Sequence, residues 1–240
     1  MHQQRQQEPH MYDLITFSAG FGNVSVSPFC VKSVWMLNHA KVAWQREDTP
    51  DPRKFAHAKL PVLRAHGRLI HDSDNIGLFL AENGADFWGA TTARDQAVGR
   101  ALIRMAEEHL YFHVVHDRWI NDAVWPHIVQ VYFTSIPKLI RGIVTKNLRK
   151  GVRQGLQGQG LGRLSDAERL LRLDQDLAAL KALLANAQYL LGDTPTLPDF
   201  SVAAVLANIA ASPVPTATSL RVRDDPVLVD YINRMKEMYD

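Results

Sequence analysis

Residues 27–30 combine a hydroxyl and a thiol at the start of an expected helix, in the order Ser27, Pro28, Phe29 and Cys30. Ser at the N-cap and Pro at the first helical position make a good helix start whatever the function, and Cys30 can be an inert buried side chain. Alternatively, a hydroxyl beside the unpaired amides of a helix N-terminus can stabilise an anion such as a thiolate. Taken alone, these residues favour the structural interpretation.

A second group of residues lies where a further strand and helix are expected to begin. Most X-Pro bonds are trans, but a cis Pro61 would turn the backbone of Leu60 outward and free its N–H and C=O to pair with an extended peptide ligand. Asp72 and Ser73 are ordinary helix-capping residues. The functional alternative is that Ser73 and nearby amides hold a ligand carboxylate while Asp72 binds an ammonium group.

The elements that must position these residues follow a β-α-β-β-α order. Short β-branched or aromatic runs predict the strands, and longer apolar patterns predict the helices. A helix stop signal at Asn83 and Gly84 predicts a domain over 12–84 after a loose tail at 1–11, then a linker at 85–92 and a second domain over 93–240. The strands are expected at 13–17, 41–46, 61–64 and near Leu69 and Ile70, and the helices at 28–40 and 73–83.

The second half shows no strand-like alternation and is expected to be all helical. Five leucines within 170–184 are spaced three, four, three and four residues apart, which places them on one helical stripe. Capping boxes mark two helix starts: Ser165 with Glu168, and Thr196 with Asp199.

The segment 151–162 holds five glycines. At about 1 kcal/mol lost per Gly, a helix is not expected to continue through it. The basic residues around it are typical of a solvated face, and contact with phosphate or lipid headgroups is disfavoured because 151–162 lacks an apolar stripe. These basic residues are Lys146, Arg149, Lys150, Arg153 and Arg163.

Histidine and aromatic side chains share the helix expected around residue 113. His109, His113 and His116 have a spacing that can place nitrogens on one face, but a metal site needs all three turned inward with an open position. Since the chain has ten histidines, the triplet is better explained by coincidence, and no metal is expected. Tyr111 and Trp119 are expected in the core or on a cleft wall, where their rings can face an apolar electrophile.

Composition excludes several function classes. The formal net charge is +2, too small a field to gather nucleic acid or anionic lipid. Cys30 is the only cysteine, so no internal disulfide or thiolate zinc cluster can form, and a reducing, cytoplasmic location is expected. The polar start at 1–10 lacks the apolar run of a secretory signal, and polar residues interrupt 128–144 too often for a membrane span.

The order of these motifs resembles that of the glutathione transferase superfamily. The motifs are Ser-Pro-Phe-Cys at 27–30, Leu-Pro at 60–61 and Asp-Ser at 72–73, followed by a helical half with Thr-x-x-Asp at 196–199. The stretches SPFCVKSVWMLNHAKV, KLP with HDSDNI, EEHLYFHVVHDRW and QGLGRLSDAE are most similar to the branch of the failed axon connections protein and the metaxins. The resemblance implies an α/β N-terminal thioredoxin-like domain plus an all-α C-terminal domain.

The resemblance also implies roles for individual residues. Ser27 lies where relatives place the catalytic Ser or Cys. Leu60, before a cis Pro61, would pair with the cysteinyl backbone of glutathione, the co-substrate. Asp72 and Ser73 would hold its γ-glutamyl end.

We therefore expect a glutathione transferase in which Ser27 holds the thiolate of glutathione for attack on a small electrophile. Two alternatives remain: a non-catalytic adaptor with the same fold, and a thiol reductase working through Cys30. The reductase is disfavoured because the exposed first position of Ser-x-x-Cys is a serine. A homodimer is possible. The segment 48–59 lacks the usual second helix, so no residue is assigned to the glycyl carboxylate.

Overall fold

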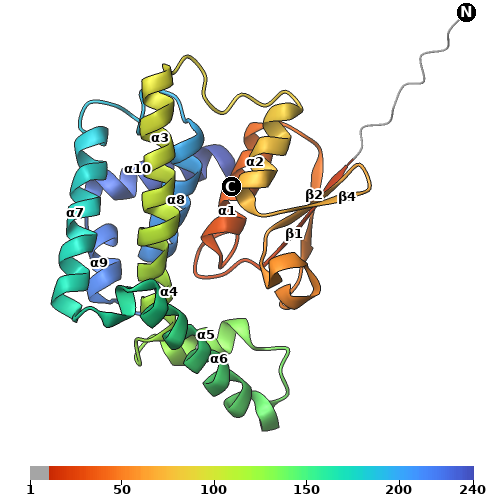
Figure 1. Ribbon diagram of the computed structural model, residues 1–240, viewed down its shortest axis with the longest axis vertical. Helices are drawn as coiled ribbons and strands as arrows, with labels where there is room; N and C mark the ends of the chain where they lie inside the picture. The colour runs from red at the N-terminus through yellow and green to blue at the C-terminus, as the bar shows by residue number, and fades with distance from the viewer. Residues whose placement is uncertain (1–10) are drawn as a thin grey trace, which may run out of the picture.

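The computed structural model describes residues 11–240, so the tail expected at 1–11 lies outside the described residues except for Met11. A four-stranded sheet with two helices is followed by a larger set of helices (Figure 1). The predicted fold class, a thioredoxin-like α/β half and an all-helical half, is confirmed.

The sheet has the strand order β2-β1-β3-β4. Strand β1 (Tyr12–Thr16) pairs in parallel with β2 (Trp44–Asp48), as expected when a crossover helix joins the two strands. Strand β3 (Val62–Ala65) is antiparallel to β1, and β4 (Arg68–His71) completes a hairpin. Strand β2 begins three residues later than predicted, because Lys41 has a left-handed φ of 54° and continues the turn after the crossover helix.

Two helices lie between the sheet and the helical half, as Figure 1 shows. Helix α1 (Pro28–His39) is the crossover between β1 and β2, and α2 (Ser73–Glu82) follows the hairpin. The apolar side chains of α1 are buried, including Val31, Trp35 and Leu37. Between β2 and β3 there are only two short 3-10 turns, Pro52–Lys54 and Ala56–Ala58, so the second helix of this fold is absent from the described chain, as predicted.

The helical half is built around α8 (Leu197–Ala210), in which every residue from Leu197 to Ile209 is buried. Helix α8 packs against α1 and against neighbouring helices, so one core joins the two halves. Both predicted capping boxes are present. The other elements are α3 (Ala93–Met105), a π-helical turn (Ala106–Leu110), α4 (Tyr111–Trp119), α5 (Trp125–Tyr132), α6 (Lys138–Gln159), α7 (Asp166–Leu184), α9 (Ala217–Arg223) and α10 (Pro226–Tyr239).

The predicted break in the glycine-rich segment 151–162 is wrong in its position. Helix α6 continues through Gly151, Gly155 and Gly158, and it ends at Gly160, which has a φ of 116°. Only Gly160 within the segment needs a conformation that favours glycine. The buried Leu156 holds this part of α6 against the protein, which offsets the low helix propensity of its glycines.

Within residues 11–240, no helix is both long and apolar enough to cross a membrane. The longest helix, α6, carries charged residues along its length.

Candidate active site

The N-terminus of α1 presents Ser27 without using its hydroxyl as a cap. Ser27 has extended backbone angles and is followed by Pro28, yet its side chain makes no capping hydrogen bond within the described chain. Pro28 has no N–H, so the Ser27 hydroxyl and the amides of Phe29 and Cys30 are the groups that can face an anion at this helix end.

Cys30 lies one turn further along α1 and is fully buried. Burial raises the pKa of the Cys30 thiol, although nearby hydroxyl groups, including those of Thr16 and Ser27, lower it in part. A buried thiol that stays protonated cannot act as an accessible nucleophile. The geometry therefore separates the two predicted catalytic residues, with Ser27 at the surface of the helix start and Cys30 behind it.

Leu60 supplies a free segment of backbone beside this helix start. The Leu60–Pro61 peptide is cis, as predicted. The side chain of Leu60 packs in a small apolar cluster with Cys30, Ile15 and Val62. Its backbone N–H and C=O have no hydrogen-bonding partner in residues 11–240, so they can pair with an extended peptide ligand.

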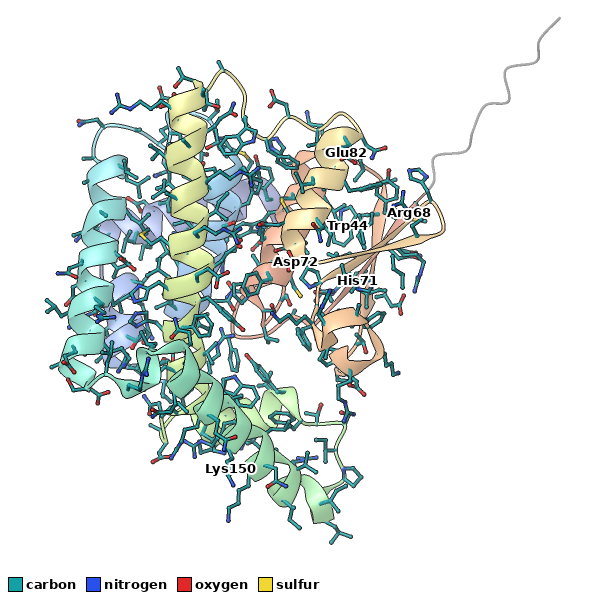
Figure 2. All side chains as sticks on the ribbon, viewed as in Figure 1. Trp44, Arg68, His71, Asp72, Glu82 and Lys150 are labelled. Atoms are coloured by element: carbon teal, nitrogen blue, oxygen red, sulfur yellow. The ribbon has the colours of Figure 1, made fainter. Side chains whose placement is uncertain are left out.

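Asp72 and Ser73 lie where β4 passes into α2, at the position labelled in Figure 2. Asp72 is exposed, has a φ of 79°, and accepts a hydrogen bond of 2.9 Å from the Asp74 amide. Ser73 is only 3% exposed and lines a cavity of about 100 Å³ that also contacts Lys32 and Asp74. The carboxylate of Asp72 is therefore open to a ligand, whereas the Ser73 hydroxyl faces inward.

A buried ion network fixes α2 relative to α1. The ammonium of Lys32, 1% exposed, lies 2.6 Å from Oδ1 of Asp74 and 2.6 Å from Oε1 of Glu107. Arg104 also pairs with both carboxylates, and Ser201 donates a 2.8 Å hydrogen bond to Glu107. Burial acts to raise the pKa of Asp74, but Lys32 and Arg104 lower it overall. Because Lys32 is on α1 and Asp74 is on α2, this network brings the Ser27 and Asp72 ends of the site together.

Arg46 holds the loop that leads into Ser27, and sequence reasoning missed it. Its guanidinium donates to the carbonyl oxygens of Val24 at 2.6 Å and Phe17 at 2.7 Å. The Ser25 hydroxyl donates to the same Phe17 carbonyl at 2.8 Å. The loop is thus fixed by hydrogen bonds to its backbone, for which the sequence carries no motif.

Arg118 holds the last part of the same loop from the helical half. It donates to the Val26 carbonyl at 2.5 Å, to the Tyr132 hydroxyl at 2.9 Å and to Oδ1 of Asn208 at 2.9 Å. Arg118 is 4% exposed, and its charge is stabilised by these oxygens. The helical half therefore positions the residue that immediately precedes Ser27.

Tyr111 forms part of the wall beside this helix start. Its ring packs edge to face on Phe29, with centroids 4.8 Å apart. Burial raises the pKa of Tyr111 to about 12, so its hydroxyl is neutral and can donate a hydrogen bond. Within the described residues that hydroxyl has no hydrogen-bonding partner.

Trp119, the other predicted wall residue, belongs to a separate aromatic cluster at the base of α5 and α6. Its ring lies 5.4 Å from that of Trp125, 6.0 Å from Phe133 and 6.3 Å from Tyr132. Tyr132 in turn lies 6.3 Å from Phe21 in the loop that precedes Ser27. Trp119 is therefore connected to the site through another ring, whereas Tyr111 adjoins it.

The rings of His109 and His113 pack edge to face with centroids 5.1 Å apart, but within the described residues the three predicted histidines do not form a set of metal ligands. His109 pairs with Asp176 at 2.5 Å, whereas His113 is fully buried with neither ring nitrogen hydrogen-bonded inside residues 11–240. Burial lowers the pKa of His113 to about 3 and that of His116 to about 4. The part of the chain that the structure describes holds no group of three metal-ligating side chains. A cavity of about 310 Å³ beside His109, lined also by Arg163 and Arg172, includes none of the predicted site residues.

Comparison with known families agrees with this fold. Residues 28–124 match the glutathione S-transferase N-terminal domain, and residues 173–235 match the glutathione S-transferase C-terminal domain. The chain belongs to the glutathione S-transferase superfamily. A curated relative of this glutathione S-transferase, the isoprene-epoxide–glutathione S-transferase of Rhodococcus sp. (strain AD45), is 29% identical over 245 residues, covering 96% of this chain and 100% of the relative.

Solved structures of glutathione transferases have the same fold. GSTFuA3 of Phanerochaete chrysosporium aligns with a TM-score of 0.68 at 15% identity, covering 97% of this chain and 98% of that structure. The beta-etherase LigF of Sphingobium sp. strain SYK-6 aligns with a TM-score of 0.62 at 16% identity, covering 96% and 99%.

Proposed function

We propose that this glutathione S-transferase joins the sulfur of glutathione to a small epoxide or a similarly reactive apolar electrophile. The free backbone of Leu60 beside the uncapped helix start at Ser27 is the observation that carries the glutathione part. The epoxide part rests on the full-length similarity to the isoprene-epoxide enzyme.

In this proposal glutathione lies along the edge formed by the starts of α1, β3 and α2. The backbone of Leu60, before Pro61, pairs with the cysteinyl residue. The exposed carboxylate of Asp72 binds the γ-glutamyl ammonium group. Because Ser73 is buried and lines the inner cavity, its backbone N–H, and not its hydroxyl, binds the γ-glutamyl carboxylate in this proposal. That N–H is at the first position of α2, where no intrahelical partner is available.

Ser27 then stabilises the thiolate. Lowering a thiol pKa from about 8.5 to about 6.5 requires roughly 2.7 kcal/mol in favour of the anion. A helix N-terminus supplies about 0.3 to 1 kcal/mol, and a hydroxyl hydrogen bond to a charged group adds roughly 1.5 to 3 kcal/mol. Together they supply about 1.8 to 4 kcal/mol, a range that includes the roughly 2.7 kcal/mol required, whereas the helix N-terminus alone falls short. The Ser27 hydroxyl is therefore required in this proposal, and Cys30 is not.

The reaction forms one C–S bond and breaks one C–O bond. The thiolate sulfur attacks a ring carbon of the epoxide, the oxygen keeps the electron pair of the broken bond, and that oxygen takes up a proton to give an alcohol. Tyr111, with its unpartnered neutral hydroxyl beside Phe29, is the side chain best placed to donate a hydrogen bond to the developing alkoxide. Trp119 acts at one remove, because its ring contacts Tyr132, which in turn lies beside Phe21 in the loop before Ser27.

The two alternatives differ in measurable ways. A thiol reductase needs Cys30 accessible, which its burial opposes. An adaptor would bind glutathione without turnover, or not bind it. The boundaries at 85–92, the cytoplasmic location, a homodimer and the closer kinship to the failed axon connections and metaxin branch stay predictions from the sequence.

The test combines calorimetric titration with glutathione and an assay of thiol loss with a small alkyl epoxide. We expect saturable heat and turnover in the parent protein, with turnover kept in Cys30→Ala. Heat without turnover on any epoxide or aromatic electrophile would support the adaptor, and the absence of heat would remove the glutathione site.

A further inference from the structure

Helices α5 and α6 form an arm that projects from the rest of the molecule (Figure 1). We define the arm as residues 125–159, from the start of α5 to the end of α6. In α6 only Thr145 and Leu156 are buried, so most of this 22-residue helix faces solvent.

The far end of the arm carries bulky apolar side chains in water. Leu139 is 96% exposed and Ile143 is 68% exposed, while Ile140 and Leu148 are 50% and 44% exposed. Leu139 and Ile143 are four residues apart and therefore lie on one side of the first two turns. An exposed apolar patch of this kind is typical of an interaction site.

Basic side chains continue along the same side of α6. Lys146 and Lys150 follow Leu139 and Ile143 at spacings of three and four residues, so all four lie on one helical stripe. Both lysines are exposed and make no hydrogen bond or ion pair with any residue from 11 to 240. Lys150 points away from the body in Figure 2.

Charge is strongly separated between the arm region and the rest of the chain. Residues 123–165 contain seven Lys and Arg residues and no Asp or Glu, whereas the whole chain has a net charge of only +2. The remainder therefore carries a net charge of −5. Arg149 is not free for a partner, because its guanidinium donates hydrogen bonds to the Trp119 and Ile120 carbonyl oxygens and to the Asp122 carboxylate. These bonds hold α6 to the end of α4.

We propose that the arm docks on an anionic lipid surface, with Leu139 and Ile143 inserted at the headgroup boundary and Lys146 and Lys150 against the lipid phosphates. An apolar tip continuous with a basic face fits interfacial binding, and the acidic remainder orients the arm toward the surface. A nucleic acid would use the lysines but gain little from exposed aliphatic tips.

The sequence disfavours lipid contact for two reasons, the small net charge of the whole chain and the lack of an apolar stripe at 151–162. The structure answers both, because the exposed apolar residues lie upstream, in the first turns of α6, and the positive charge is concentrated on the projecting arm. This proposal is independent of the glutathione site.

The test is co-sedimentation of the full chain with vesicles of phosphatidylcholine alone or with about 30% phosphatidylserine, the class of anionic lipid that attracts basic segments. We expect binding only to the anionic vesicles. Lys146→Gln with Lys150→Gln should weaken it by roughly 30-fold, and Leu139→Ser with Ile143→Ser by at least about ten-fold.

Matched controls are Leu171→Ser, an exposed leucine on α7, and Lys54→Gln with Arg223→Gln, two exposed basic residues outside the arm. These should bind vesicles like the parent, and all variants should keep its melting temperature. Equal binding to neutral vesicles, no binding at all, or equal losses in the controls would overturn the proposal. So would binding unaffected by the leucine and isoleucine changes, or a concentration-dependent dimer abolished by them.

Discussion

Replacing Lys32 by methionine tests whether the buried ion network holds the site together. The change keeps the apolar stem and removes a charge that is 1% exposed and lies 2.6 Å from both Asp74 and Glu107. Removing one partner of a buried pair costs about 3 to 5 kcal/mol. Because Arg104 still contacts both carboxylates, we expect the lower end, about 3 kcal/mol.

That loss corresponds to a fall in melting temperature of roughly 6 to 12 °C for a chain of this size. Glutathione affinity should fall as well, since Asp74 lies two residues after Asp72 on α2. Thermal and urea unfolding measure the stability, and calorimetry measures the affinity. Lys150→Met, on the exposed face of α6, is the control and should leave both unchanged.

The double variant with Glu107→Gln isolates the pair. If the Lys32–Glu107 contact stabilises the fold, the double variant should lose about 1 to 3 kcal/mol less unfolding free energy than the two single variants added together. The reason is that each single change leaves an unbalanced buried charge. A loss below about 1 kcal/mol for Lys32→Met, or strict additivity, would refute the argument from burial.

Three further predictions concern single residues. Ser27→Ala should slow conjugation roughly 10- to 150-fold while glutathione still binds, whereas Cys30→Ala should leave the rate nearly unchanged. If steady-state kinetics show instead that Cys30→Ala is the slower variant, the Cys30 thiol is the catalytic group. Asp72→Ala should weaken glutathione binding roughly 30- to 150-fold with little change in melting temperature, and unchanged calorimetric affinity would place the ligand elsewhere. His113 has a folded pKa of about 3, below its usual 6.5, so the unfolded state takes up more protons as pH falls. His113 should then remove about 2 kcal/mol of stability between pH 7 and 5, in addition to the loss from His116, whose pKa is also lowered by burial. Urea unfolding of His113→Phe should show a flatter pH dependence, and a slope identical to that of the parent would mean that His113 does not contribute.

The sequence predicted those features that depend on neighbouring residues. The Thr196 and Asp199 box and the proline-led start of α1 are local hydrogen-bonding patterns, so they are readable from residue type and spacing. The cis geometry of Pro61 is predicted from its place in the β-α-β-β-α order together with the family resemblance.

Features that depend on distant partners could not be read in this way. Arg46 and Arg118 bond backbone carbonyls 22 to 92 residues away, and a carbonyl gives no sequence signal. The helix through Gly155 and Gly158 is held by Leu156 packing against the protein, so tertiary contact overrides local propensity. The burial of Ser73, which lines the same cavity as Lys32 and Asp74, likewise depends on the packing of α2 against α1.

The most direct test of the proposed activity is the pKa of the glutathione thiol in its complex with this protein, followed by thiolate absorbance during a pH titration. If the helix start and the Ser27 hydroxyl stabilise the anion, that pKa should fall by about 2 units from its free value of about 8.5. In Ser27→Ala most of the shift should disappear while glutathione remains bound. A bound thiol that titrates like free glutathione, or an unchanged shift in Ser27→Ala, would contradict the role given to Ser27.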